Sequence, residues 1–257
     1  MRIRVERGTE IDDENRFYPI FVSLEDRVCL VIGGGEVAQR KVAGLLRFGA
    51  VIRIVAKDLT CRLEERCDGT RVRWIGRDYE PGCLDAVDLV FAATSDVELN
   101  RRISADARAR KLWCNMASDP EMGTFIVPSM VTRGALNLAV STGGASPALA
   151  REIREKLEKE FGPEWGPYIR LMGYLRKVIQ SMGLESSENQ RLFRAIAALP
   201  ILSWIQEGRR GEILRGLQDV CGPRLGIEGL NALLDELWKP FSSSSQPCAT
   251  PPEPSAT

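Results

Sequence analysis

One segment constrains the fold of this chain more than any other: an apolar run, a glycine turn and an amphipathic helix follow one another directly. Residues 27–32 have the length and the β-branched residues of a buried strand. The run ends at Gly33–Gly35, and residues 36–48 then place their apolar side chains at helical spacing. A second apolar strand is predicted at residues 51–56. The order strand, turn, helix, strand is the unit that builds a parallel sheet.

The glycine turn has the pattern G-x-G-x-x-A over Gly33–Ala38. Between a strand and a helix, the first glycine permits the tight turn and Gly35 lets the backbone approach a pyrophosphate. Ala38 allows close packing of the helix on the strand, and the helix N-terminus presents free amides to phosphate. The alternative is a tight turn that binds nothing. We predict that Gly33, Gly34 and Gly35 form a dinucleotide site.

Two more strand ends should border this site. An acid at the end of the second strand usually bonds the ribose hydroxyls, and Asp58 follows the glycine turn by about 20 residues. Its neighbour Lys57 would instead suit a 2′-phosphate, so spacing alone leaves NAD and NADP open. Thr94 and Ser95 follow the predicted strand at residues 89–93, and ligands bind at the carboxyl ends of such strands.

The remaining pattern divides the chain into regions. Further strands are predicted at 70–75 and 112–116, a helix at 97–111, and an edge strand or a lead-in at 17–22. Residues 124–131 and 135–141 read as antiparallel strands, followed by a helix at 147–160. The helical segments expected after that are 168–182, 187–199, 201–206, 212–219 and 229–237. The fold class is therefore α/β, a Rossmann-type parallel sheet followed by a small strand–helix region and a helical C-terminal domain.

The expected boundaries follow from these changes of pattern. They are a flexible arm at 1–16, the Rossmann domain at 17–123, the strand–helix region at 124–160, the helical domain at 161–240 and a disordered Ser/Pro-rich tail at 241–257.

Histidine is absent from the chain, which limits its chemistry. Ser-His-Asp and Cys-His mechanisms and histidine-based metal sites are excluded, and we predict no metal site. Acid–base work must come from Asp, Glu, Lys, Tyr, Cys, water or the substrate. The seven cysteines are odd in number and form no Cys-x-x-Cys pair, which disfavours a disulfide framework. Cys29 and Cys114 lie in strand-like runs and are expected to be buried.

Charge and hydropathy exclude other classes. The 35 basic and 35 acidic residues balance, which argues against bulk nucleic-acid binding. No apolar run reaches the roughly 18 residues of a membrane span, and residues 1–16 lack the apolar core of a signal peptide. We expect a cytoplasmic protein with no membrane or nucleic-acid partner.

Six stretches between residues 17 and 160 form an ordered series of motifs. They are Tyr18–Phe21, Cys29–Lys41, Ala92–Asp96 followed by Asn100, Cys114–Asn115 to Pro120, Phe125–Ser129 and Ala139–Pro147. This series resembles the precorrin-2 dehydrogenase family, which includes the N-terminal half of siroheme synthase.

The resemblance implies an enzyme that oxidises precorrin-2 to sirohydrochlorin with NAD. Some members also insert ferrous iron to make siroheme, and whether this chain does so stays open. The family fold is a Rossmann domain, a dimerisation region and a helical domain, in an intertwined homodimer with the active site between domains. The family's cofactor contacts match Glu36, Val37, Lys57 and Asp58, which favours NAD.

The family's catalytic aspartate matches Ser118 here, and the neighbouring acid is Asp119. Asp119 takes over the acid–base role if the loop shifts by one residue. The alternative is that Asp119 caps a turn before Pro120. A loop serine linked to chelation and phosphorylation in some members matches Thr142, with Ser141 and Ser146 nearby. There the alternative is a flexible glycine loop followed by a helix cap.

Substrate binding should involve cations, because the tetrapyrrole that the resemblance implies carries many carboxylates. The candidates are Arg40, Lys41, Arg133 and Arg151, and a solvated surface charge is the alternative for each. Thr142 and Ser146 are further candidates for substrate contacts. Three other functions stay open: a different NAD-dependent oxidoreductase, a non-catalytic NAD-sensing module, and a structural dimer that has lost catalysis.

Overall fold

The computed structural model describes residues 17–222 and 225–237. The predicted arm at 1–16 and the predicted tail at 241–257 lie outside these residues. The described chain forms two compact units. The N-terminal unit contains residues 17–128 and 141–149, and the C-terminal unit contains residues 129–140, 150–222 and 225–237.

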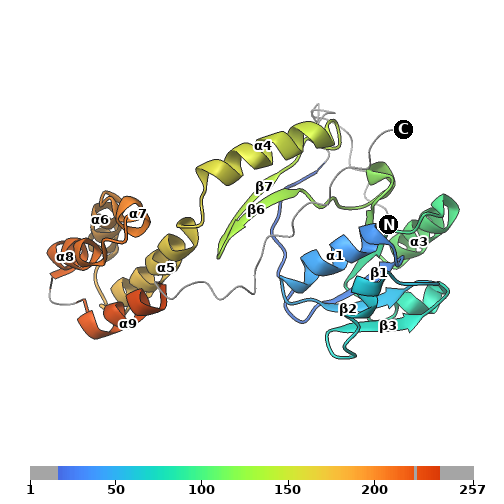
Figure 1. The fold of residues 1–257 in the computed structure, drawn as a ribbon, viewed down its shortest axis with the longest axis horizontal. Coiled ribbons are helices and arrows are strands. Elements are labelled where there is room, and N and C mark those ends of the chain that lie inside the picture. Colours follow the sequence, from blue (N-terminus) through green and yellow to red (C-terminus); the bar gives the residue numbers. More distant parts are fainter. Residues whose placement is uncertain (1–16, 223–224, 238–257) are drawn as a thin grey trace, which may run out of the picture. The chain divides into compact units, whose positions relative to one another are not determined.

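The N-terminal unit is built on five parallel strands (Figure 1). They are β1 (Val28–Ile32), β2 (Val51–Val55), β3 (Val72–Gly76), β4 (Leu89–Ala92) and β5 (Trp113–Met116). Their order is β3-β2-β1-β4-β5, so the chain adds strands to one side of β1 and then to the other. The reversal places the carboxyl ends of β1 and β4 side by side, which is where open α/β sheets bind ligands. The predicted Rossmann-type fold is confirmed.

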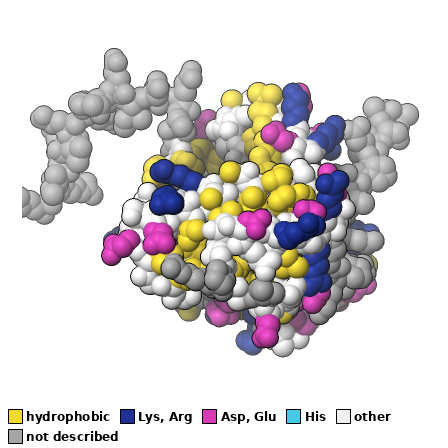
Figure 2. Space-filling view, turned by 90° about the vertical axis from the view of Figure 1, so that its left-hand side faces the viewer, with side chains coloured by type: hydrophobic (Ala, Val, Ile, Leu, Met, Phe, Trp, Pro, Cys, Tyr) yellow, Lys and Arg dark blue, Asp and Glu magenta, His cyan; other side chains and the backbone are white. Residues whose placement is uncertain are grey.

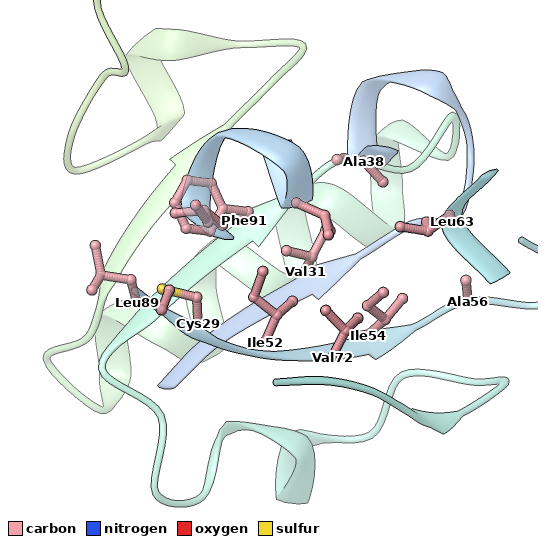
Figure 3. Packing of buried hydrophobic residues seen from close by; sticks show 14 residues of the cluster. Cys29, Val31, Ala38, Ile52, Ile54, Ala56, Leu63, Val72, Leu89 and Phe91 are labelled. Carbon is pink, nitrogen blue, oxygen red and sulfur yellow. The ribbon is translucent and has the colours of Figure 1, made fainter. Parts of the chain in front are cut away.

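Helices cover both faces of this sheet. They are α1 (Glu36–Leu46), the short α2 (Cys61–Glu64) and α3 (Val97–Ala109), with 3₁₀ turns η1 (Pro81–Leu84) and η2 (Pro120–Met122). Alternate residues of a strand point to opposite faces. Val31 and Phe91 therefore pack towards Ala38 of α1 in one core cluster (Figure 3), and Leu30 and Val90 share a second cluster with Ile103 of α3. Burial on both faces explains why these strands are apolar throughout.

Two local predictions in this unit need correction. The edge strand considered at residues 17–22 is wrong, because this segment has no strand pairing and exposes Tyr18 and Phe21. Pro19 has no amide to donate to a sheet, which is consistent with an unpaired segment. The sequence also missed α2, whose single turn is too short to show a periodicity. Thr60 starts that helix, and its Oγ1 accepts a hydrogen bond from the Leu63 amide at 3.3 Å.

The C-terminal unit combines a hairpin with helices. Strands β6 (Ser129–Arg133) and β7 (Leu136–Val140) pair antiparallel, as predicted, although β6 begins later than residue 124. Gly134 makes the turn with a φ of +60°. Helix α4 (Pro147–Glu160) follows, and its residues from Ala150 belong to this unit. The remaining helices are α5 (Trp165–Ser181), α6 (Ser186–Ala197), α7 (Ile201–Gln206), α8 (Arg210–Cys221) and α9 (Ile227–Leu237).

The hairpin is grouped with the helices rather than in a separate region at 124–160. Arg133 makes part of this connection, because its Nε donates to the Phe161 carbonyl at 2.9 Å. The helices themselves pack around one apolar core that includes Leu171, Leu175 and Ile213. Figure 2 faces the helical end of the chain and shows apolar side chains between charged ones at the surface. Within residues 17–222 and 225–237, no helix has both the length and the apolar character needed to cross a bilayer.

Candidate functional site

Two glycines after β1 are required by the packing of the protein itself. Gly33 has a φ of +127°, and a Cβ on it would lie 2.3 Å from the Ala93 carbonyl oxygen. A Cβ on Gly34 would lie 1.9 Å from the carbonyl oxygen of Asp58. Both neighbours are backbone atoms, which cannot move aside as a side chain can. The glycine turn is therefore packed between the segments that follow β4 and β2.

Gly35 differs from the two glycines before it, because a Cβ there would meet nothing within 4 Å. It is the N-cap of α1 and makes no side-chain cap. The exposed residues Glu36 and Val37 follow it, and their amides have no acceptor within the described part of the chain. The open space lies at the positive end of a helix dipole, which suits an anionic group. The turn therefore fits a pyrophosphate, and buried Ala38 allows the close helix packing that was predicted.

The segment after β2 is held against the glycine turn. The Thr60 amide donates to the Gly34 carbonyl at 2.9 Å, and the Thr60 hydroxyl donates to Oε1 of Gln39 on α1 at 2.7 Å. Lys57 and Asp58 are exposed at the start of this segment. The predicted pair thus lies beside the turn, at the end of β2, where a ribose acid is expected.

Thr94 and Ser95 follow β4, and Asn100 positions Thr94. The amide nitrogen of Asn100 donates to the Thr94 carbonyl at 3.0 Å, and the Thr94 hydroxyl donates to Asn100 Oδ1 at 2.8 Å. Asn100 is fully buried. Asp96 caps α3 by accepting from the Leu99 amide at 3.0 Å. Sequence reasoning missed Asn100 as a site residue, although a polar residue on the buried face of a helix is a usable signal.

Ser118 and Asp119 follow β5 at the same edge of the sheet. Ser118 is exposed and Asp119 is half-buried. Oδ1 of Asp119 accepts from the Glu121 amide at 3.1 Å, which caps η2. The turn-capping alternative therefore describes one oxygen of this carboxylate. Its catalytic role stays a prediction.

Of the α1 cations, Arg40 is exposed, whereas Lys41 is half-buried. The Lys41 ammonium lies 6.0 Å from the centroid of the Phe91 ring, and burial, together with the nearby Arg40 charge, lowers its pKa. Asn115 of β5 lies on the same face of the sheet and donates to the Phe125 carbonyl at 3.1 Å. Its buried Oδ1 has no partner within the described residues.

The loop before α4 makes its own hydrogen bonds. The Thr142 hydroxyl donates to the Ser146 carbonyl at 3.1 Å and accepts from the Ser146 amide at 3.0 Å. Oγ of Ser146 accepts from the Leu149 amide at 3.2 Å, so it caps α4. The helix-cap alternative accounts for these contacts. A role of either hydroxyl towards substrate stays a prediction.

Arg133 and Arg151 belong to the C-terminal unit, where both have protein partners. Besides Phe161, the Arg133 guanidinium donates to the Glu158 carbonyl at 3.2 Å and so satisfies the C-terminus of α4. Arg151 pairs with Glu155 one turn along α4, with 3.0 Å between Nε and Oε1. The contacts give Arg133 a structural role, and substrate binding by either residue remains untested.

The buried cysteines behave as predicted. Cys29 and Cys114 are both free and fully buried. Burial raises the pKa of the Cys29 thiol to about 12 and that of the Cys114 thiol to about 11. Neither is suited to nucleophilic chemistry at neutral pH. In the two described stretches of chain, no three His, Cys, Asp or Glu side chains cluster as metal ligands would.

Comparison with known proteins agrees with this geometry. Residues 20–129 match the family described as "Putative NAD(P)-binding", and residues 133–160 match the family "Sirohaem biosynthesis protein central". The first match contains every residue placed above around the carboxyl ends of the strands. The expected cofactor class, a nicotinamide dinucleotide, agrees with it.

Individual proteins show the same similarity. The siroheme synthase of Methylobacillus flagellatus is 39% identical over 175 residues, which is 68% of this chain and 37% of that protein. Siroheme synthase 1 of Cronobacter sakazakii is 43% identical over 160 residues, or 62% of this chain and 34% of that protein. The chain thus spans well under half the length of these relatives. A solved structure, "SirC, precorrin-2 dehydrogenase", is 25% identical with a TM-score of 0.57, covering 86% of this chain and 98% of that one.

Proposed function

Because this chain belongs to the family that joins an NAD(P)-binding domain to the central domain of sirohaem biosynthesis proteins, we propose that it is a precorrin-2 dehydrogenase. The proposed reaction is the oxidation of precorrin-2 to sirohydrochlorin with NAD as acceptor. The similarity to a structure named precorrin-2 dehydrogenase over 98% of that chain supports this activity.

The observation that carries the proposal is the open side of Gly35. The protein needs glycine at 33 and 34 for its own packing, but nothing in the described structure requires it at 35. What this glycine leaves free is room for the pyrophosphate at the N-terminus of α1. The amides of Glu36 and Val37 would bind the phosphates, and Asp58 would accept hydrogen bonds from the ribose. Thr94 and Ser95 would line the other half of the site.

When bound, the nicotinamide supplies a two-electron acceptor for a hydride from the macrocycle. The oxidation also releases a proton, and in a chain without histidine a carboxylate is a suitable acceptor for it. We propose Asp119 for this step. The turn uses its Oδ1, which leaves Oδ2 for a proton. Ser118, exposed beside it, would contribute a hydroxyl to the same loop.

The substrate's carboxylates need cations, and α1 offers Arg40 and Lys41 close to the proposed dinucleotide site. The predicted contacts of Arg133, Thr142, Ser146 and Arg151 are part of the same proposal. The cytoplasmic location and the use of ferrous iron as a second substrate stay predictions.

A homodimer is also part of the proposal, and the hairpin supports it. A two-stranded sheet alone is marginally stable in water, and β6 and β7 have no further strand in the described chain. A second copy of the chain would add strands to its edges. The family resemblance points to this region as the dimerisation region.

The main alternative is a module that binds NAD without catalysis. Ser118 stands where the family has its aspartate, and Asp119 is engaged in a turn, which favours this alternative. The two functions differ in whether precorrin-2 changes its absorbance in the presence of NAD.

The test is an anaerobic assay of the purified chain with precorrin-2 and NAD, followed by addition of ferrous ion. Formation of NADH together with sirohydrochlorin is expected, and a second absorbance change after ferrous ion would report iron insertion. Asp119→Asn is the informative variant, because an asparagine oxygen still caps η2 but cannot accept a proton. Unchanged turnover in this variant would eliminate Asp119 as the base. Binding of NAD with no turnover in the wild type would favour the sensing module.

A further inference from the structure

An ion pair at the end of β2 is not used by the function proposed above. Nη2 of Arg77 lies 3.0 Å from Oδ1 of Asp58. Arg77 follows β3, 19 residues away in sequence, so the pair joins the ends of two neighbouring strands. Both side chains are exposed, and both therefore remain accessible to a ligand.

The arginine is held in place by Trp74. The indole nitrogen of Trp74 donates to the Ala56 carbonyl at 3.1 Å and to the Gly76 carbonyl at 2.9 Å. The Arg77 guanidinium carbon lies 5.9 Å from the centroid of the indole ring. A guanidinium over an aromatic face is attracted by the ring, and it loses less freedom when it binds an anion. The cation is thus positioned against the backbone that leads into Asp58.

The aspartate is held equally close to the glycine turn. Its own carbonyl lies against Gly34, where even a methyl group would clash, and the Thr60 amide bonds to the Gly34 carbonyl. A dinucleotide bound at Gly35 would therefore have its adenosine ribose beside Asp58. Lys57 adds a second exposed cation next to it.

These charges have opposite preferences at the ribose 2′ position. A carboxylate accepts hydrogen bonds from a 2′-hydroxyl and repels a 2′-phosphate, whereas an arginine binds the phosphate. In this chain the carboxylate is already paired with an arginine. The repulsion between the Asp58 carboxylate and a phosphate is therefore partly neutralised. The Arg77 guanidinium, which would bind the phosphate, has its Nη2 3.0 Å from Oδ1 of Asp58.

Given the proposed dinucleotide site, we propose that the Asp58–Arg77 pair sets the choice between NAD and NADP, with Arg77 and Lys57 as the binding site for a 2′-phosphate. Asp58 holds the ribose hydroxyls when NAD binds. When NADP binds, Arg77 exchanges the carboxylate for the phosphate. The wild-type chain therefore prefers NAD but also binds NADP measurably.

The experiment is calorimetric titration of the full chain with NAD⁺ and NADP⁺, and with 5′-AMP and adenosine 2′,5′-bisphosphate as probes of the adenosine end. Arg77→Gln should weaken NADP⁺ and the bisphosphate by about tenfold and change NAD⁺ little, because one charge-assisted contact is lost. Asp58→Asn should strengthen NADP⁺ relative to NAD⁺ by about tenfold, because the repulsion is removed. Arg73→Gln is the matched control: it removes an exposed arginine of β3 that bonds to the Gly69 carbonyl instead, and it should change neither affinity.

The outcomes separate this inference from the proposed function. No association of the wild type with either dinucleotide would remove both. Binding of NAD⁺ with the same NAD⁺ to NADP⁺ ratio in wild type, Arg77→Gln and Asp58→Asn would overturn the inference and leave the dehydrogenase proposal standing. Matching melting temperatures would show that the variants are folded, as expected for exposed side chains. Higher salt should also weaken NADP⁺ binding more in the wild type than in Arg77→Gln.

Discussion

The two units of this chain bury different kinds of side chain. In the described residues, the buried polar side chains are Asn100, Ser104 and Asn115, and all three belong to the N-terminal unit. The core of the C-terminal helices is apolar, with Leu171, Leu175 and Ile213 fully buried. A buried polar group costs stability unless it is bonded, and Asn100 meets this requirement through its two bonds to Thr94. In the N-terminal unit, Asn100 positions the loop after β4.

The glycines of the two units also differ in the atoms that surround them. Gly33 and Gly34 touch backbone atoms of neighbouring loops, so any side chain there would displace main chain. Gly216 and Gly229 in the C-terminal unit instead make room for the far ends of Trp204 and Tyr174. At the proposed dinucleotide site the loops therefore meet backbone to backbone, and neither can give way. In the helical core a neighbouring side chain can move to make room. Four predictions test this difference.

The largest effect is expected from Gly34→Ala. Its methyl group would lie 1.9 Å from the Asp58 carbonyl oxygen, so the loops must separate. We expect the N-terminal unit to lose about 3 kcal/mol of unfolding free energy. NAD⁺ association should disappear in calorimetry.

Gly35→Ala is the control for that variant. A methyl group there meets no protein atom, so the melting temperature should stay close to the wild type while NAD⁺ binding is lost. Equal stability of Gly34→Ala and Gly35→Ala would contradict the distinction between the two glycines.

Leu175→Ala tests the other unit. Leu175 is a fully buried residue of α5, and its truncation leaves a cavity. The free energy of unfolding should fall by about 3 kcal/mol, within the usual range of about 2–5 kcal/mol for such substitutions. Denaturant unfolding monitored by tryptophan fluorescence measures it. NAD⁺ affinity under native conditions should be unchanged, and a large loss of affinity would show that the units are coupled.

Alkaline pH should lower the free energy of unfolding of the N-terminal unit. Burial raises the pKa of Cys29 from about 9 to about 12, so between these values the unfolded chain loses the thiol proton and the folded chain keeps it. The stabilisation is complete below pH 9 and is lost as the pH rises towards 12. At pH 10.5 the loss amounts to about 2 kcal/mol. Unfolding measured from pH 8 to 10.5 should show this slope in the wild type. Cys29→Ala should reduce the slope and leave the smaller part that comes from Cys114, whose pKa burial raises to about 11. An unchanged slope in Cys29→Ala would assign it to other groups.

The smallest effect is expected at Thr60. Its hydroxyl caps α2 and contacts Gln39, so Thr60→Ala should cost about 1 kcal/mol and weaken NAD⁺ several-fold by loosening the segment that carries Asp58. Thr60→Ser keeps the hydroxyl and should restore both quantities. Failure of serine to restore them would mean that the methyl group, not the cap, is what matters.

Much of the fold and the position of the glycine turn could be predicted from local sequence pattern. The strand before Gly33, the helix after it and the five helices after residue 160 follow from apolar spacing, because each element shows its burial in its own period. The glycine turn could be assigned for the same reason, since the motif needs only its flanking elements. The segment at 17–22 could not, because a short apolar run has the same pattern whether or not a strand pairs with it.

The sequence by itself determined the β-α-β unit, the glycine turn and, apart from α2 and the segment at 17–22, the order of strands and helices, since these depend on neighbours in the chain. Only the tertiary structure decided that Arg77 reaches Asp58, that Asn100 holds Thr94, and that Gly34 is packed against the Asp58 carbonyl. Apart from the Asn100 bond within one loop and helix, these contacts join residues about 20 or more positions apart. They arise because parallel strands bring their carboxyl ends to one edge, and no local pattern records which side chains meet there.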